Sequence, residues 1–134
     1  MIKKNSEKGF TLIELIVVVS IILILSGLLV PKVLGYQDKA RKAKVVTTGR
    51  QIFEASMESY TEEEGKFDLA KLKSSITAVT DAQIAADGVT LTEGSDQIAT
   101  VKFASDNKNY SETITASSNQ FIIKEGSSEI YKNK

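Results

Sequence analysis

The sequence contains no cysteine, no histidine and no tryptophan among its 134 residues. Without cysteine, no disulfide can stabilise an exported domain, so its fold has to be held by a hydrophobic core. Without histidine and cysteine, the common nucleophile–base pairs and the common zinc sites cannot form. The sequence also lacks a glycine-rich phosphate-binding loop. It therefore predicts a protein that is not an enzyme and needs no cofactor.

One long apolar run dominates what is present. The 21 residues from Phe10 to Val30 contain a single charged side chain, Glu14. A helix of this length is about 31 Å long, which matches a hydrocarbon core of about 30 Å. The run therefore predicts a single membrane-spanning helix. Lysines 3, 4 and 8 precede it, and basic flanks stay in the cytoplasm, so we expect the N-terminus inside and the rest of the chain outside.

The formal net charge of zero hides an uneven distribution of charge. Residues 32–50 contain six basic side chains and one acidic one, whereas residues 51–134 contain eight basic and fourteen acidic ones. The basic segment is either a solvated helix face or a surface that contacts lipid head groups, nucleic acid or an acidic neighbour. A second copy of the chain also fits, because one chain carries both signs.

Helical periodicity continues beyond the apolar run, and a helix is expected from Phe10 to about Glu63. A narrow stripe of apolar and small residues recurs at steps of three and four, which predicts an amphipathic helix that lies against another element. Gly65 is well placed to end the helix. The stripe comprises Val33, Tyr36 or Gln37, Ala40, Ala43, Val46, Gly49, Ile52 or Phe53, Ser56 and Tyr60.

Pro31 interrupts this helical pattern. Proline removes one backbone hydrogen bond and clashes with the carbonyl four residues earlier, which here belongs to Gly27. Either the helix ends at the membrane surface, or the two residues form a helix break at which the helix kinks or locally melts. We favour the second alternative, because the periodicity resumes directly after the proline.

The remaining sequence predicts a short helix followed by strands. Asp68 is expected to cap a helix that carries Leu69, Leu72, Ile76 and Val79 on one face. Asp87-Gly88 and residues 117–119 are expected to be turns, and residues 105–109 a polar loop. Strands are expected at 98–103, 110–116, 121–124 and 130–131. Short connections between successive strands favour an antiparallel meander with one face against the helix.

Acidic side chains of the C-terminal half do not predict a metal site. No compact spacing among them resembles a calcium loop. They are Asp81, Asp87, Glu93, Asp96 and Asp106.

The segment Gly9-Phe10-Thr11-Leu12-Ile13-Glu14 at the start of the apolar run needs a separate explanation. A charge at membrane depth is expensive and marks a functional site by default. An ordinary secretory signal peptide has a shorter apolar region and an Ala-x-Ala cleavage site, and neither is found here. A plain signal anchor, for instance of a module that binds a lipid surface, explains neither Gly9 nor Glu14.

This segment and the apolar run resemble the class III signal of type IV pilins and pseudopilins. The resemblance is close over residues 1–35, and Pro31 falls where that family has a helix-disrupting proline. Gly65-Lys66-Phe67 is also similar to the family, although Phe67-Asp68 stands where the family usually has tyrosine and proline. The resemblance implies an α+β type IV pilin fold, in which a long N-terminal helix leads into a small antiparallel sheet.

The resemblance also implies how the N-terminus is processed. A prepilin peptidase would cut after Gly9, and the new amine of Phe10 would be methylated. Glu14 would then pair with the Phe10 amine of an adjacent subunit in a filament. The physical argument agrees, because leaving one partner of a buried charge pair alone costs about 3–5 kcal/mol.

Four segments follow from this resemblance. Residues 1–9 are a leader, 10–30 the transmembrane and assembly helix, 31–65 an amphipathic helix half, and 66–134 a head with an αβ-loop and the sheet. The expected partners are further copies in a helical filament, the prepilin peptidase, and indirectly an inner-membrane platform protein and an assembly ATPase. The precursor would lie in the cytoplasmic membrane and the assembled subunit in an extracellular pilus.

Two functions of this family fit the sequence. The favoured one is a pilus subunit that serves adhesion, motility or aggregation, and the alternative is a pseudopilin of a type II secretion or competence DNA-uptake system. DNA binding by the basic residues Lys39, Arg41, Lys42 and Lys44 is disfavoured, because subunits packed along the helix would bury them. The absence of cysteine and the lysine, glutamate and asparagine usage indicate a Gram-positive source.

Overall fold

The structure is a computed structural model that describes residues 9–95 and 97–133. The chain divides into two compact units, Met1–Lys39 and Ala40–Lys134, and the long helix α1 (Leu12–Glu62) contributes to both. The expected leader lies, apart from Gly9, outside the described residues. The expected long helix is confirmed, with its first residue two positions later than the sequence indicated.

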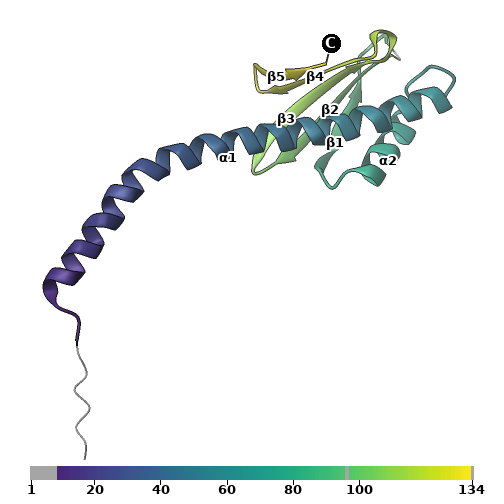
Figure 1. Cartoon of the computed structure of the whole chain (residues 1–134). Coiled ribbons are helices and arrows are strands. Elements are labelled where there is room, and N and C mark those ends of the chain that lie inside the picture. The colour runs from purple at the N-terminus through teal and green to yellow at the C-terminus, as the bar shows by residue number, and fades with distance from the viewer. Residues whose placement is uncertain (1–8, 96, 134) are drawn as a thin grey trace, which may run out of the picture. The chain divides into compact units, whose positions relative to one another are not determined.

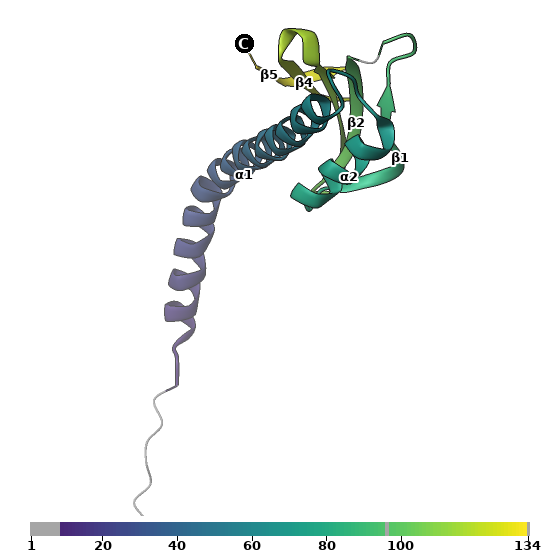
Figure 2. The ribbon, with the colours of Figure 1, turned by 90° about the vertical axis from the view of Figure 1, so that its right-hand side faces the viewer.

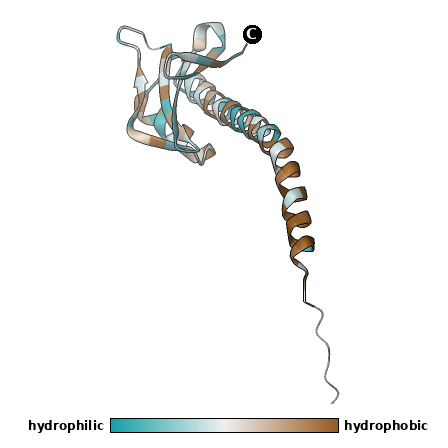
Figure 3. Cartoon of the chain, turned by 90° about the vertical axis from the view of Figure 1, so that its left-hand side faces the viewer, coloured by the Kyte–Doolittle hydropathy of each residue, from teal (hydrophilic) through white to brown (hydrophobic). Residues whose placement is uncertain are grey.

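The first part of α1 is apolar and exposed. Every residue from Gly9 to Ala40 is exposed, and the hydropathy colouring of Figure 3 shows this end of the helix as almost continuously hydrophobic. Among the described residues, α1 is the one helix long and apolar enough to cross a membrane. In the part of the chain that the structure describes, the apolar side chains of this stretch remain exposed.

Pro31 lies inside α1 and does not end it. The helix is continuous through Gly27 and Pro31, so the alternative of a helix end at the membrane surface is wrong. A proline within a helix still removes one backbone hydrogen bond. A kink or a locally melting segment at these residues therefore stays a prediction.

The last part of α1 buries one face. Gly49, Ile52 and Ser56 of the expected stripe are buried, whereas Val46 is only half-buried and its neighbour Val45 is fully buried. The face comprises Val45, Gly49, Ile52, Ala55, Ser56 and Ser59.

Gly65 ends the helix as expected. Its φ of +85° lies in the left-handed region, which glycine adopts without a steric penalty. Its N–H donates to the carbonyl of Tyr60 at 3.0 Å, which satisfies one of the carbonyls left open at a helix C-terminus.

The short helix α2 (Leu69–Val79) follows. Asp68 caps it as predicted, since its carboxylate accepts a hydrogen bond from the N–H of Lys71 at 3.0 Å. Leu72 and Ile76 are fully buried. Leu69 and Val79, which the periodicity placed on the same face, remain about half exposed.

Five strands form the antiparallel sheet, which confirms the predicted α+β architecture. The strands pair in the order β1-β2-β3-β4-β5, so each strand pairs only with its neighbours along the chain. Figure 1 shows this meander beside α2 and the C-terminal part of α1. The strands are β1 (Gln83–Leu91), β2 (Ile98–Ser105), β3 (Lys108–Thr115), β4 (Gln120–Glu125) and β5 (Ser128–Lys132), with a 3₁₀ turn η1 (Ala116–Ser118) before β4.

One face of the sheet is buried. Alternate residues of β2, β3 and β4 point to it, as the period of two along a strand requires. Figure 2 shows α1 and α2 beside each other against the sheet. The core of this unit therefore lies between one sheet face and two helices, and it includes Ile52, Leu72, Ile76, Val101, Ile114 and Ile123.

Two sequence expectations about connections are wrong. Asp87-Gly88 is not a turn but part of β1, where the register with β2 shifts between Ile84 and Val89. A bulge of this kind lets the strand continue pairing on both sides. The expected loop 105–109 shrinks to Asp106-Asn107, which have φ of +51° and +61° and form a two-residue hairpin turn.

Candidate functional site

The first turn of α1 is a capping box. The Oε2 atom of Glu14 accepts hydrogen bonds from the backbone N–H and from the hydroxyl of Thr11, both at 2.8 Å. The N–H of Glu14 donates in return to the Thr11 hydroxyl at 3.3 Å. Two free donors at the helix start are thus satisfied by one another's side chains. A carboxylate in the first turn is also favoured by the helix dipole.

The second oxygen of the Glu14 carboxylate, Oε1, is available for a donor from another molecule. Both hydrogen bonds from Thr11 reach Oε2, and in the part of the chain that the structure describes no donor reaches Oε1. The residue is exposed on a helix whose surrounding side chains are apolar. This site can therefore accept a hydrogen bond or a positive charge from another molecule without losing its cap.

Gly9 and Phe10 precede the helix and are exposed. They carry no helical hydrogen bonds, and the Phe10 side chain is 89% exposed. A Cβ added at Gly9 would meet no atom within 4 Å. The peptide bond between these two residues therefore lies outside the capped helix, and the space around Gly9 is open.

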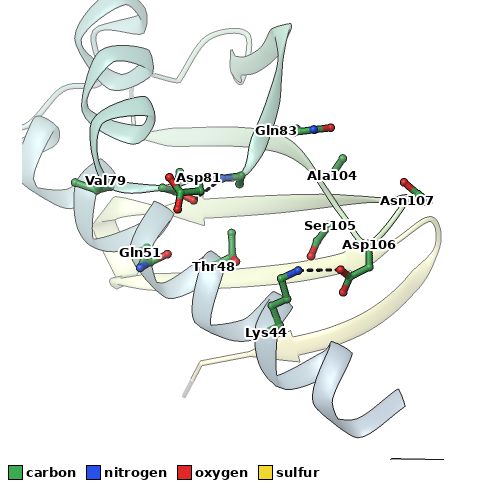
Figure 4. Close-up of a pocket in the computed structure, with 12 residues that line it drawn as sticks. Lys44, Thr48, Gln51, Val79, Asp81, Gln83, Ala104, Ser105, Asp106 and Asn107 are labelled. Carbon is green, nitrogen blue, oxygen red and sulfur yellow. Dashed lines mark hydrogen bonds and ion pairs between the residues drawn. The ribbon is translucent and has the colours of Figure 1, made fainter. Parts of the chain in front are cut away.

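The basic segment is partly engaged with the head. The Lys44 ammonium donates to the Asp106 carboxylate at 2.8 Å, across one end of a polar cavity of about 460 Å³. Figure 4 shows Lys44 reaching from α1 to Asp106 in the turn between β2 and β3. The Lys44 ammonium lowers the pKa of the Asp106 carboxyl below its usual value. Lys44 is therefore engaged with the head although its side chain is exposed, and Lys39 and Lys42 are exposed as well.

Acidic residues of the head do not gather around a common point. Within residues 9–95 and 97–133, no three Asp, Glu, His or Cys side chains are arranged to hold a metal ion. Of the acids that the sequence analysis considered, Asp96 lies outside the described residues.

Two residues that the sequence analysis did not single out matter to the structure. Thr11 holds the helix start, and the pattern threonine-x-x-glutamate before an apolar run was a usable signal for it. Glu112 is fully buried in the core of the head. Its strand pattern, in which Tyr110 and Ile114 flank it on the same face, was the signal for that burial.

Comparison with known proteins supports the assignment of the N-terminal segment. Residues 4–30 match the prokaryotic N-terminal methylation motif. Two relatives match the chain, both named type II secretion system core protein G. The protein from Klebsiella michiganensis is 47% identical over 45 residues, which are 34% of this chain and 32% of the relative. The protein from Escherichia coli strain K12 is 44% identical over 43 residues, or 32% and 30%.

The chain thus covers about a third of the length of these relatives. They give no support to the expected Gram-positive source. No solved structure matches the chain. The match to the motif covers the glycine, the aromatic residue, the capped glutamate and the apolar helix described above. The chain therefore carries the N-methylation motif of prokaryotic pilins and pseudopilins, at the start of a long helix that leads into an antiparallel sheet.

Proposed function

We propose that this chain is a structural subunit of a pilin-like filament and not an enzyme. The observation that carries the proposal is the methylation motif at residues 4–30, which extends into the apolar and exposed first part of α1. A prepilin peptidase would remove residues 1–9, and the new Phe10 amine would be methylated. The segments 10–30, 31–65 and 66–134 would then be the assembly helix, the amphipathic half and the head. No cofactor or metal is needed for this role.

The apolar surface of α1 supports assembly by lateral packing of helices. It is energetically unfavourable for the apolar side chains of residues 10–30 to be exposed to water. Lipid would cover them in the precursor, and the helices of neighbouring subunits would cover them in the filament. A contact of this kind, which does not close on itself, generates an open helical array. Gly27 and Pro31 would let the helix stretch or bend as it leaves the membrane.

Glu14 would guide assembly through its remaining oxygen. Cleavage after Gly9 creates a positive amine at Phe10, and the amine of an adjacent subunit would reach Oε1 while Thr11 keeps Oε2. A charge pair that forms only between subunits makes assembly relieve the cost of an unpaired charge.

The experiment compares three variants of the N-terminal turn. Glu14→Ala should insert into the membrane normally and form no filaments by electron microscopy. Glu14→Gln removes the charge but can retain the capping box, so it should also fail to assemble. Thr11→Ala weakens the cap but keeps the charge, so it should assemble at least in part. Normal fibre yield from Glu14→Gln would overturn the pairing.

Processing is tested separately. Gly9→Leu places a bulky side chain at the proposed cleavage site and should leave the leader attached. Intact-mass spectrometry of the membrane-extracted protein reads the result directly. A Gly9→Leu chain that still begins at Phe10 would contradict the proposed site, whereas Gly9→Ala is the milder control.

Two kinds of filament fit this proposal. The names of the two relatives favour a pseudopilin of a type II secretion system. A type IV pilus for adhesion, motility or aggregation is the other candidate, and it has the same N-terminal requirements. Electron microscopy of sheared surface material separates them, because long surface fibres containing this chain identify a pilus. In either system a platform protein and an assembly ATPase would drive the filament from the inner membrane.

A further inference from the structure

The Glu112 carboxyl is buried in the core of the head. Glu112 lies in the middle of β3, where it pairs with Val101 of β2 and Ile123 of β4. None of its surface is exposed, and among residues 9–95 and 97–133 neither of its carboxyl oxygens has a hydrogen-bond partner. Burying an ionised carboxyl without a partner is strongly unfavourable. The proposed function makes no use of this group.

Glu112 faces α1 at Gly49, where the helix has no side chain. A Cβ built on Gly49 would lie 3.2 Å from Oε2 of Glu112 and would collide with the end of the Ile123 side chain. The helix backbone and the sheet therefore lie close together at Gly49. We call the group formed by Gly49, Val101, Glu112 and Ile123 the carboxyl clasp.

The elements around the clasp offer no counter-charge among the described residues. On α1, Lys44 pairs with Asp106 and the Arg50 guanidinium donates to the Tyr131 hydroxyl at 3.2 Å. Lys102 of β2 and Lys124 of β4 are exposed, next to the inward-facing Val101 and Ile123 and so on the opposite face of the sheet. The clasp is thus lined by apolar side chains and helix backbone.

From this geometry we infer that the carboxyl clasp is a pH-sensitive contact that holds the sheet against α1. It closes when Glu112 is protonated, because a neutral carboxyl can be buried among apolar groups at moderate cost. Ionisation of Glu112 draws water towards the carboxylate and loosens the contact at Gly49. The inference concerns the head alone and does not depend on filament assembly.

The expected direction of the pH dependence follows from burial. Burial raises the pKa of Glu112 from its ordinary value of 4.5 to about 9. Between these two values the folded chain holds a proton that the unfolded chain has lost. As far as it depends on Glu112, the free energy of unfolding is highest below pH 4.5 and falls as the pH rises towards 9. In that window the unfolding equilibrium constant should rise about tenfold per pH unit at the most.

The test is urea unfolding of the full chain in detergent micelles between pH 5 and 8.5, followed by tyrosine fluorescence. The wild type should lose stability steadily across this range. Glu112→Gln keeps the size of the side chain and cannot ionise. The change in its unfolding equilibrium constant between pH 5 and 8.5 should therefore be at least tenfold smaller than that of the wild type. The matched control is Glu125→Gln, which removes a surface carboxylate paired with Lys108 and should retain the wild-type pH dependence.

Equal pH dependence of the wild type and Glu112→Gln would overturn the inference. If Glu112→Gln does not fold, a carbon-13 NMR titration of the Glu112 carboxyl in the wild type decides instead. A carboxyl that stays protonated above pH 7 supports the clasp, and one that ionises near pH 4.5 refutes it.

Discussion

The two glutamates that stand apart in this chain have opposite surroundings. Glu14 lies on an exposed apolar helix and its carboxylate receives two hydrogen bonds from Thr11. Glu112 lies in the core of the head, and its carboxyl receives no hydrogen bond from the residues that the structure describes. In the first region the carboxylate accepts hydrogen bonds at one oxygen, while the apolar surface around it is uncovered. In the second, the apolar groups are covered and neither carboxyl oxygen has a donor among the described residues.

The two regions therefore differ in what is left uncovered or unpaired: apolar surface in the first, and a buried carboxyl in the second. In the proposed function, lipid or neighbouring helices cover the exposed apolar side chains of the first part of α1. The head instead buries its own core, and the Glu112 carboxyl lies inside that core. Substitutions in the second region should therefore change the free energy of unfolding of the head, and substitutions in the first region should not. Matched pairs of residues, one from each region, test this difference.

The largest expected difference is between two isoleucines of the same helix. Ile52 is fully buried in the head, and Ile52→Ala should lower its free energy of unfolding by about 2–5 kcal/mol. Ile22 is half exposed, and Ile22→Ala should leave urea unfolding of the head unchanged. Both variants are measured as full chains in micelles. A comparable loss of stability in the two would remove the distinction between the regions.

Two glycines of α1 provide a second pair. Gly49→Ala places a methyl group against Ile123 and Glu112 and should destabilise the head by about 1 kcal/mol or more. At Gly35 a Cβ has no neighbour within 4 Å, so Gly35→Ala should preserve stability or raise it slightly through helix propensity. Circular dichroism during thermal unfolding distinguishes the two, and a stable Gly49→Ala variant would show that the close approach is dispensable.

A smaller effect is expected at the start of α2. Asp68→Ala removes the side-chain acceptor for the N–H of Lys71 and should cost about 1 kcal/mol of stability. Asp68→Asn retains an acceptor and is the control, with a loss of only a fraction of that value. If Asp68→Ala and Asp68→Asn have the same free energy of unfolding, the side-chain hydrogen bond of Asp68 does not contribute to stability.

The smallest effect is expected at the surface of the head. Lys44→Met breaks the ion pair with Asp106, which is largely exposed and screened by salt. The change in urea midpoint should be close to experimental error and should vanish in 1 M salt. A large, salt-independent loss would mean that the Lys44 side chain packs in the cavity of Figure 4 rather than acting through its charge.

Features with a strong local pattern were predictable from the sequence. The apolar run predicts the exposed part of α1. Gly65 marks the end of α1 through a backbone hydrogen bond, and Asp68 marks the start of α2 through a side-chain hydrogen bond. The strand predicted at 110–116 corresponds to β3, in which Tyr110 and Ile114 are buried and the residues between them alternate with the buried ones. Each of these signals depends on residues close together in the sequence.

Features decided by distant contacts were not predictable in the same way. Asp87-Gly88 has the composition of a turn, yet pairing with β2 on both sides keeps it in a strand. The stripe of α1 is displaced by one residue at Val45, because the sheet and not the helix decides which side is covered. The burial of Glu112 opposite Gly49 joins residues more than sixty positions apart, and helix periodicity does not reveal such a pair.

The sequential order of the strands has a consequence for how the head folds. Each hairpin joins segments that are adjacent along the chain, and local contacts of this kind lower the entropic barrier to folding. We expect the sheet to form quickly, without waiting for disulfide exchange, since the chain has no cysteine. We expect the slower step to be the docking of Gly49 and Ile52 onto β3 and β4, because it joins segments that are far apart in the sequence.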